Sequence, residues 1–334
     1  MPILHRLLNI DPVEVEFSRR GFACPDPQIR QRLENVGRIF LYGYDAALRH
    51  KNHDALAACL QRVALEHRGF AYEGAAMATT LRDRLTFRGH AFERFLAGRG
   101  KDHIYMLHVG AGWAYARLPW LRSRIESAIR NLHPVLRWLV IDGYGFHQGY
   151  FYLDKPRLLN HSLACLSINA RRIFYQGLGR SLWFSHGAQV PAIAAAIARF
   201  RALYREDAWS GVGLACAYAG GISAAAIAEL RSRAGENSAA LAQGAAFAAK
   251  ARQRAGNPAR HTEDACLALC GMSADAAAAL CDQTFRQIDL HHPCPYQHWR
   301  RLLQQSLISS SEIPVRGESH ERPISLPVAA AKSH

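Results

Sequence analysis

Lysine is scarce in this chain, although the overall charge is strongly basic. Only five of its 41 basic residues are lysines, set against 27 acidic residues in a formal net charge of +14. The excess is therefore arginine, which also serves ion pairs and anion recognition. A basic charge of this origin is weak evidence for nucleic-acid binding, so we expect no nucleic-acid partner.

Export and disulfide signals are also missing. The first residues form a short apolar run broken by Arg6 and Asp11, with neither a long apolar core nor a small-residue cleavage site. Eight cysteines in 334 residues are too dilute for a scaffold stapled by disulfides. We therefore expect a cytoplasmic protein with reduced thiols.

The chain lacks the glycine-rich nucleotide loops and the Gly-x-Ser-x-Gly elbow. A classical dehydrogenase, kinase or α/β-hydrolase is therefore disfavoured. A zinc site can be drawn from Cys266 and Cys270 with downstream cysteines and histidines, but it has no paired Cys-x-x-Cys knuckle. Buried small apolar side chains explain these cysteines better, so we expect no metal.

No convincing membrane span is present either. The longest uncharged stretch covers residues 208–228, which is long enough to cross a bilayer. It consists mostly of Ala, Gly and Ser, with Gly220 and Gly221 at its middle. We expect two buried helix ends around a turn there instead of a span.

What the chain does have is the composition of a globular protein, 49% apolar and 20% charged, which excludes disorder throughout. Alanine-rich segments with apolar residues three and four apart recur, and no segment shows sustained two-residue alternation. These patterns predict an all-α fold with few strands.

Internal duplication is indicated by three similar segments that begin at Arg38, His103 and Arg172, each a basic residue before Ile and an aromatic. Their isoleucines are 65 and 69 residues apart. We predict a single all-α domain over 1–307 built of repeated helical pairs, either solenoid-like or an α/α bundle. Its expected parts are sub-repeats 38–100, 103–171 and 172–256, a C-terminal helical hairpin over 262–306, and a disordered tail over 308–334.

Local signals refine the hairpin and the repeated helices. Thr262 resembles an N-cap, Gly271 a C-cap and Ser273 a second N-cap, which predicts two helices between about 262 and 284. Glycine within a helix costs about 1 kcal/mol relative to alanine, so tertiary contacts must offset it. Either the glycines let helices cross closely, or they leave room for a cavity.

Polar groups in these small, apolar helices are the candidates for catalysis. Glu73, Asp142 and His147 are possible acid and base groups, since a buried ionisable side chain needs a partner or a shifted pKa. Asp142 and His147 are five apart, so direct contact needs a bend near Gly143 and Gly145. Asp142 fits equally well as the cap of a helix that begins at Gly143.

Other side chains on the same segments are candidates for binding substrate. Aromatic rings could wall a pocket for a conjugated apolar ligand and stabilise a developing cation, while an ordinary aromatic core remains the alternative. For His108 the alternative is a core histidine bonded to a carbonyl. The candidate substrate-binding residues are His108, Trp113, Tyr144, Gln148, Tyr175, Gln176, Arg180, Trp183 and Gln243.

Five segments in order carry a family resemblance: HIYMLHVGAGWA (103–114), DGYGFHQGYF (142–151), QGLGRSLWF (176–184), WSGVGLACAYAGG (209–221) and AQGAAFAAKAR (242–252). Over roughly residues 10–305 the chain resembles the bacterial family of domain of unknown function 1702, whose members recur in enediyne biosynthetic gene clusters. The resemblance implies a role in converting or handling a linear polyene, and it transfers no catalytic residue.

We therefore expect a protein that binds a linear lipophilic polyene, or a polyprenyl-like molecule, and promotes its cyclisation or isomerisation. A non-catalytic chaperone or scaffold for the polyketide synthase, and a non-canonical terpene-type cyclase, stay open. The Asp-Asp-x-x-Asp and Asp-x-Asp-Asp motifs of terpene cyclases are missing. The basic run from Arg82 to Lys101 is either a solvated face or a docking site for an acidic carrier protein. No cofactor is indicated.

Overall fold

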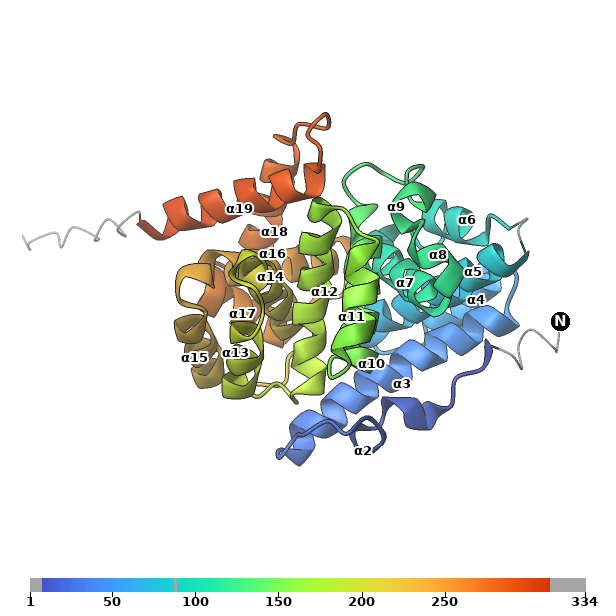
Figure 1. The fold of residues 1–334 in the computed structure, drawn as a ribbon, viewed down its shortest axis with the longest axis horizontal. Coiled ribbons are helices and arrows are strands. Elements are labelled where there is room, and N and C mark those ends of the chain that lie inside the picture. The colour runs from blue at the N-terminus through green and yellow to red at the C-terminus, as the bar shows by residue number, and fades with distance from the viewer. Residues whose placement is uncertain (1–7, 87–88, 313–334) are drawn as a thin grey trace, which may run out of the picture.

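The computed structural model describes residues 8–86 and 89–312. Within these ranges the chain forms helices joined by turns, with no strand. The predicted all-α class is confirmed. In Figure 1 helices α10 to α12 (Trp138–Ser185) lie between the earlier helices on one side and α13 to α17 (Val190–Cys270) on the other.

A row of long helices forms the centre of the molecule, each packed against the next in the row. These helices are α3 (Pro27–Arg49), α5 (Arg68–Thr86), α7 (Ile104–Arg117), α10 (Trp138–Tyr152), α12 (Ile168–Ser185), α14 (Ala202–Ala219) and α16 (Ser238–Ala255). From α5 onward these helices are rich in apolar or small residues and are buried on most sides, as a helix in a protein core should be. Helix α3 is amphipathic and buries one face.

The other helices connect and cover the central row. They are α2 (Phe17–Arg20), α4 (His53–Leu60), α6 (Ala91–Ala97), α8 (Pro119–Arg122), α9 (Ile125–Ala128), α11 (Pro156–Ala164), α13 (Val190–Ala198), α15 (Ala224–Ala234), α17 (Arg260–Cys270), α18 (Ala274–Phe285) and α19 (Pro295–Glu312). Within the described residues, the 3₁₀ turns η1 (Pro12–Val15), η2 (Leu65–His67), η3 (Lys101–His103) and η4 (Gly235–Asn237) complete the path. The expected tail lies outside the described residues from 313 onward, and residues 308–312 belong to α19.

Glycine sets how closely the central helices approach. Each crossing has a glycine whose added Cβ would overlap a backbone carbonyl of the facing helix, as Gly177 does with Asp142 and Gly211 with Gln176. Close helix crossing is therefore confirmed as a reason for these glycines. Successive crossing glycines are 31 to 36 residues apart. The spacings of 65 and 69 residues between the similar sequence segments therefore each span two crossings. The series is Gly43, Gly74, Gly110, Gly143, Gly177, Gly211 and Gly244.

The central row curls until its first helices meet its last. Arg32 of α3 donates its Nε–H to the carbonyl of Ala219 at the end of α14, at 2.7 Å. The ring of Phe70 in α5 packs edge-on against Tyr218 of α14, with centroids 5.1 Å apart. Helices far apart in sequence therefore enclose a common interior.

Four local predictions can now be judged. Asp142 is not an N-cap, because the apolar residues before it extend α10 back to Trp138. Thr262 is not a cap either, since α17 begins at Arg260 and the Thr262 hydroxyl donates to the carbonyl of Ala217 at 2.7 Å. Gly271 is confirmed as a left-handed C-cap and Ser273 as the N-cap of α18.

The uncharged stretch 208–228 folds as predicted at its centre. Helix α14 ends at Ala219, and Gly220 and Gly221 make the turn with positive φ. Ala224 and Ala225 at the start of α15 are exposed and Ile227 is buried, so most of the burial in this stretch is on the α14 side. Across residues 8–86 and 89–312 no single helix is long and apolar enough to cross a membrane, and only the bent pair α17 and α18 passes by length and composition.

Candidate functional site

The curl of the central helices encloses a cavity of about 550 Å³. Helices α3, α5, α7, α10, α12 and α14 contribute to its wall, and residues 9–15 before α2 close one side. The volume lies within the range of small-molecule sites, which are typically apolar clefts with a few placed polar groups. Aromatic side chains dominate the wall: Phe40, Phe70, Trp113, Phe146, Tyr150, Phe151, Tyr152, Phe184 and Tyr218.

Two charged side chains form the floor of this cavity. Glu73 of α5 and Arg180 of α12 are both buried. Oε1 of Glu73 lies 4.0 Å from Nη2 of Arg180. The indole of Trp113 donates to Glu73 Oε1 at 3.1 Å. Arg180 also stacks over the ring of Phe146, with 4.9 Å from its central carbon to the ring centroid. A carboxyl group and a cation thus face an aromatic chamber.

Asp142 binds Arg180 on the side that faces away from the cavity. The Arg180 guanidinium donates to the Asp142 carboxylate, and both side chains are buried. Gln176 Nε2 donates to the other oxygen of Asp142 at 2.8 Å. Asp142 lies on the far side of Arg180 from the cavity and does not line it.

A buried polar ladder continues from Asp142 along the central row. Its members are Asp142, Gln176, Ser210 and Gln243, each of which directly precedes a crossing glycine. Ser210 bridges its neighbours by donating to Gln243 at 2.9 Å, with Gln176 Oε1 also within 3.4 Å. The close crossings bring these equivalent positions within hydrogen-bonding distance, so the repeat itself builds the ladder.

Helix α19 covers the ladder from outside the row. Tyr296 of α19 accepts from Gln176 at 2.9 Å, and Arg300 donates to Gln243 at 3.1 Å. Arg300 also pairs with the buried Asp207 of α14 at 2.6 Å. A buried charge pair needs such additional hydrogen bonds to offset its desolvation.

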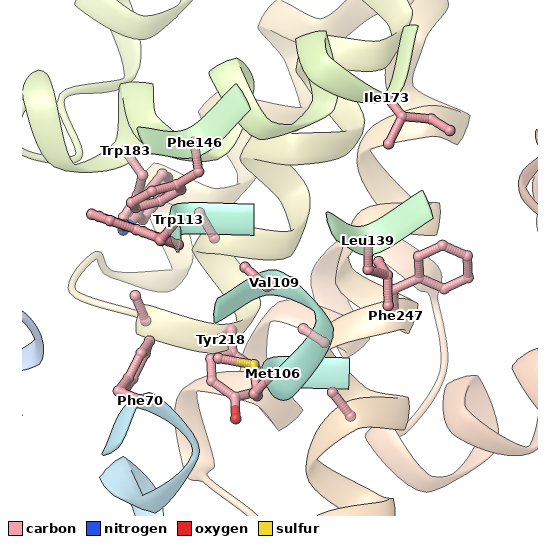
Figure 2. Close-up of a cluster of buried hydrophobic side chains, with 14 of the residues drawn as sticks. Phe70, Met106, Val109, Trp113, Leu139, Phe146, Ile173, Trp183, Tyr218 and Phe247 are labelled. Atoms are coloured by element: carbon pink, nitrogen blue, oxygen red, sulfur yellow. The ribbon is translucent and has the colours of Figure 1, made fainter. Parts of the chain in front are cut away.

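A second, much smaller void of about 40 Å³ lies behind the floor. Arg180, Leu214 and Tyr218 line both spaces, so these three side chains separate them. Figure 2 follows this order across the core, from Trp113 and Phe146, through Met106, Val109 and Tyr218, to Leu139 and Phe247.

Burial controls the ionisation of the cavity groups. It raises the pKa of Glu73 to about 7, which Arg180 partly opposes and Asp142 reinforces. For Arg180, burial acts against the charge, but Asp142 and Glu73 raise the pKa overall. Burial lowers the pKa of His147 to about 3, and Arg117 lowers it further. Near neutral pH, Glu73 is therefore partly protonated and His147 is uncharged.

The predicted site residues divide between the cavity and the surrounding core. Glu73, Trp113, His147 and Arg180 line the large cavity. Although Asp142 and His147 share α10, no hydrogen bond joins them within the described residues, and His147 instead lies against Trp113 and Phe151. The predicted residues that line neither space are His108, Tyr144, Gln148, Tyr175, Gln176, Trp183 and Gln243.

Those outer residues have contacts of their own in the core. His108 Nδ1 lies 2.7 Å from the carbonyl of Ile104, and burial lowers its pKa to about 4. Trp183 donates to the carbonyl of Gly220, and Tyr175 stacks on Tyr204 with centroids 4.2 Å apart. These contacts fit the alternative to ligand binding, namely a core histidine bonded to a carbonyl and an ordinary aromatic core.

Tyr144 and Gln148 of α10, the other two predicted residues on this helix that lie outside the cavity, are also buried. Tyr144 of α10 packs edge-on against Phe174, and Gln148 accepts from the Ser162 hydroxyl of α11 at 3.3 Å. Both lie on the sides of α10 that face other helices. They support the wall without reaching the cavity.

Several important groups were not predicted from the sequence. Tyr218 lines both spaces, Ser210 joins the ladder, and Tyr296 and Arg300 approach from α19. The residue before each crossing glycine is a signal that could have identified Ser210. No comparable signal marks Tyr296, which lies 120 residues after Gln176.

No metal centre is evident in the part of the chain that the structure describes, where no three His, Cys, Asp or Glu side chains group closely enough to hold an ion. Cys266 and Cys270 are buried on α17, with their sulfurs near the carbonyls of Ala245 and Ala242 of α16.

The fold and cavity define an all-α protein whose central helices surround a cavity with many aromatic side chains in its wall. The chain belongs to the family described as protein of unknown function (DUF1702), which matches residues 2–307. No curated protein and no solved structure matches it.

Proposed function

We propose that this protein binds a linear lipophilic polyene, in an enediyne-type polyketide pathway, and promotes its cyclisation or isomerisation by proton transfer. The observation that carries this proposal is a buried carboxyl group, Glu73, at the floor of an aromatic cavity of about 550 Å³. A pKa of about 7 keeps part of Glu73 protonated near neutral pH, which suits a general acid.

Each neighbouring group has a role in this scheme. Glu73 delivers its proton to one carbon of the polyene, and the resulting carboxylate recovers a proton from another carbon, so the enzyme returns to its starting state. The face of Trp113 stabilises positive charge that develops on the chain. Asp142 acts as a positioning residue, because its pairing with Arg180 fixes the guanidinium beside Glu73.

The proposal is tested by E73Q, which keeps size and an acceptor for the Trp113 indole but removes the proton donor. The purified variant should bind the methyl ester of cis-parinaric acid, a fluorescent conjugated tetraene, within about twofold of wild type. In a strain lacking the gene, E73Q should fail to restore the final product, and the unconverted polyene should accumulate.

The matched control is E229Q, the same chemical change at an exposed ion pair with Arg233. It should restore product fully. Full restoration by E73Q would instead support the non-catalytic chaperone. Failure of the wild-type protein to bind the ester would overturn polyene binding itself.

A further inference from the structure

The cavity has a buried end and an open end. Glu73 and Arg180 at the floor are almost fully covered, whereas Arg117 is exposed and Arg122 and Tyr152 are half-buried. We call the open end the rim, lined by Asn9, Asp11, Arg117, Arg122 and Tyr152. A long ligand in this space has one end in an apolar interior and the other near water.

The acidic side chains near the rim already have partners in their own segment. Asp11 caps η1 by accepting from the amide of Val13 at 3.0 Å. Glu14, which also lines the cavity, pairs with Arg20 at 2.7 Å and with Arg19 at 3.4 Å. Glu14 therefore has two cationic partners. Asp11 accepts from a neutral amide, and it forms no ion pair with Arg117 or Arg122 among the described residues.

The two arginines on the opposite side of the rim are not neutralised. Within residues 8–86 and 89–312, neither Arg117 nor Arg122 forms an ion pair. Arg122 donates through Nε and one terminal nitrogen to the carbonyl of Ala116, which leaves its second terminal nitrogen, and Arg117, available to a ligand. Unpaired guanidinium groups beside an apolar cavity are suited to a carboxylate, which they bind by charge-assisted hydrogen bonds.

The positive charge of the rim extends to a buried neighbour, His147. Its side chain lines the cavity and is 5% exposed, and its Nδ1 has no hydrogen-bond partner among the residues that the structure describes. Protein atoms cover Nδ1, so a ligand in the cavity does not reach it in this conformation. Burial lowers the pKa of His147, and the positive charges of Arg117, Arg122 and Arg20 lower it further.

We infer that the ligand is an amphipathic acid whose carboxylate stays at the rim with Arg117 and Arg122 while its unsaturated tail extends to Glu73. This inference rests on the proposed function and adds the chemical class and direction of the substrate. The head group at the rim fixes which carbons of the tail lie beside Glu73.

The test compares two probes on the full chain, cis-parinaric acid and its methyl ester, which differ only in the charge of the head group. Wild type should bind the acid at least about tenfold more tightly than the ester, and added salt should weaken only the acid. R117Q changes an exposed side chain. It should lose most of the preference for the acid and bind the ester as wild type does.

R233Q, an exposed arginine of α15 that pairs with Glu229, serves as the matched control and should keep the preference. Because the ester reports folding and cavity integrity, equal losses for acid and ester in R117Q would overturn the inference. So would equal binding of both probes by wild type, which would leave the proposed function intact. If R117Q instead keeps the acid preference and loses only binding to an acidic carrier protein, the arginines form a protein-docking site and the inference is wrong.

Discussion

At the scale of single residues, the site depends on two acids that share one arginine. If Glu73 and Asp142 were both ionised beside Arg180, the buried cluster would carry one uncompensated negative charge. Burial raises the pKa of Glu73 to about 7, so a proton on Glu73 removes this excess, and Arg180 and Asp142 remain as a neutral pair. Asp142 has two strong donors, Arg180 and Gln176, whereas Glu73 has the Trp113 indole. The fold thereby assigns the mobile proton to the acid that faces the cavity.

His147 should make the protein sensitive to acid. Its pKa is about 3 in the folded protein, against an ordinary value of 6.5, so between these values only the unfolded chain takes up its proton. Its contribution to stability is complete above about pH 6.5 and is lost as pH falls toward 3. H147F should reduce the loss of unfolding free energy between about pH 7 and about pH 4 by roughly 2 kcal/mol.

Urea unfolding at several pH values measures this effect. H90F makes the same substitution at an exposed histidine and is the control for the exchange itself. An unchanged slope in H147F would show that the imidazole takes up its proton in the folded state. The buried His108 keeps part of the acid sensitivity in every variant.

At the scale of helices, the glycine crossings determine whether the central row can form. A Cβ at Gly211 of α14 would overlap the Gln176 carbonyl and approach the Arg180 amide of α12, and neither backbone group can move aside alone. G211A should therefore destabilise the fold by about 3 kcal/mol or more, despite the better helix propensity of alanine. Gly256 is a suitable control, because it has open space around it and only a positive φ.

Chemical denaturation compares the two variants. G256A should cost about 1 kcal/mol from backbone strain alone. An equal or smaller loss in G211A would mean that α12 and α14 separate easily, and that the crossing is not a tight constraint.

Helices were more predictable from the sequence than the site. Alanine-rich periodicity and the absence of alternation identified the all-α class, and Gly271 and Ser273 marked the hairpin turn. Asp142 was ambiguous because Asp before Gly is typical of a cap, and the apolar residues 138–141 that extend α10 carry no start signal. Tertiary packing decided that helix boundary.

The site was less predictable because it is assembled across the row. Glu73, His147 and Arg180 line one cavity because α5, α10 and α12 curl around it, and no local pattern encodes that curvature. Composition predicted polar groups in an apolar setting, but it could not separate Arg180 at the floor from Gln243 in the core.

At the scale of the whole molecule, the cavity exists only because the curled row is closed. Arg252 of α16 is central to this closure, since it is 2% exposed and donates to three carbonyls from separate segments. They belong to Glu66 before α5 at 3.1 Å, Tyr218 at the end of α14 at 2.6 Å, and Asn257 at 2.9 Å. Its guanidinium also lies over the Tyr218 ring, 4.3 Å from the centroid. One side chain therefore joins the two ends of the arc.

Replacing this side chain should loosen the chamber as well as the fold. R252M keeps much of the aliphatic volume but leaves three carbonyls without their donor, which should cost about 3 kcal/mol and lower Tm. Because Tyr218 lines the cavity, the polyene ester should also dissociate several-fold faster, as stopped-flow fluorescence would measure. R254M is the matched control, two residues further along the same helix and exposed, and it should change neither value. A loss of Tm in R252M with an unchanged dissociation rate would mean that the wall around Glu73 holds its shape without the closure.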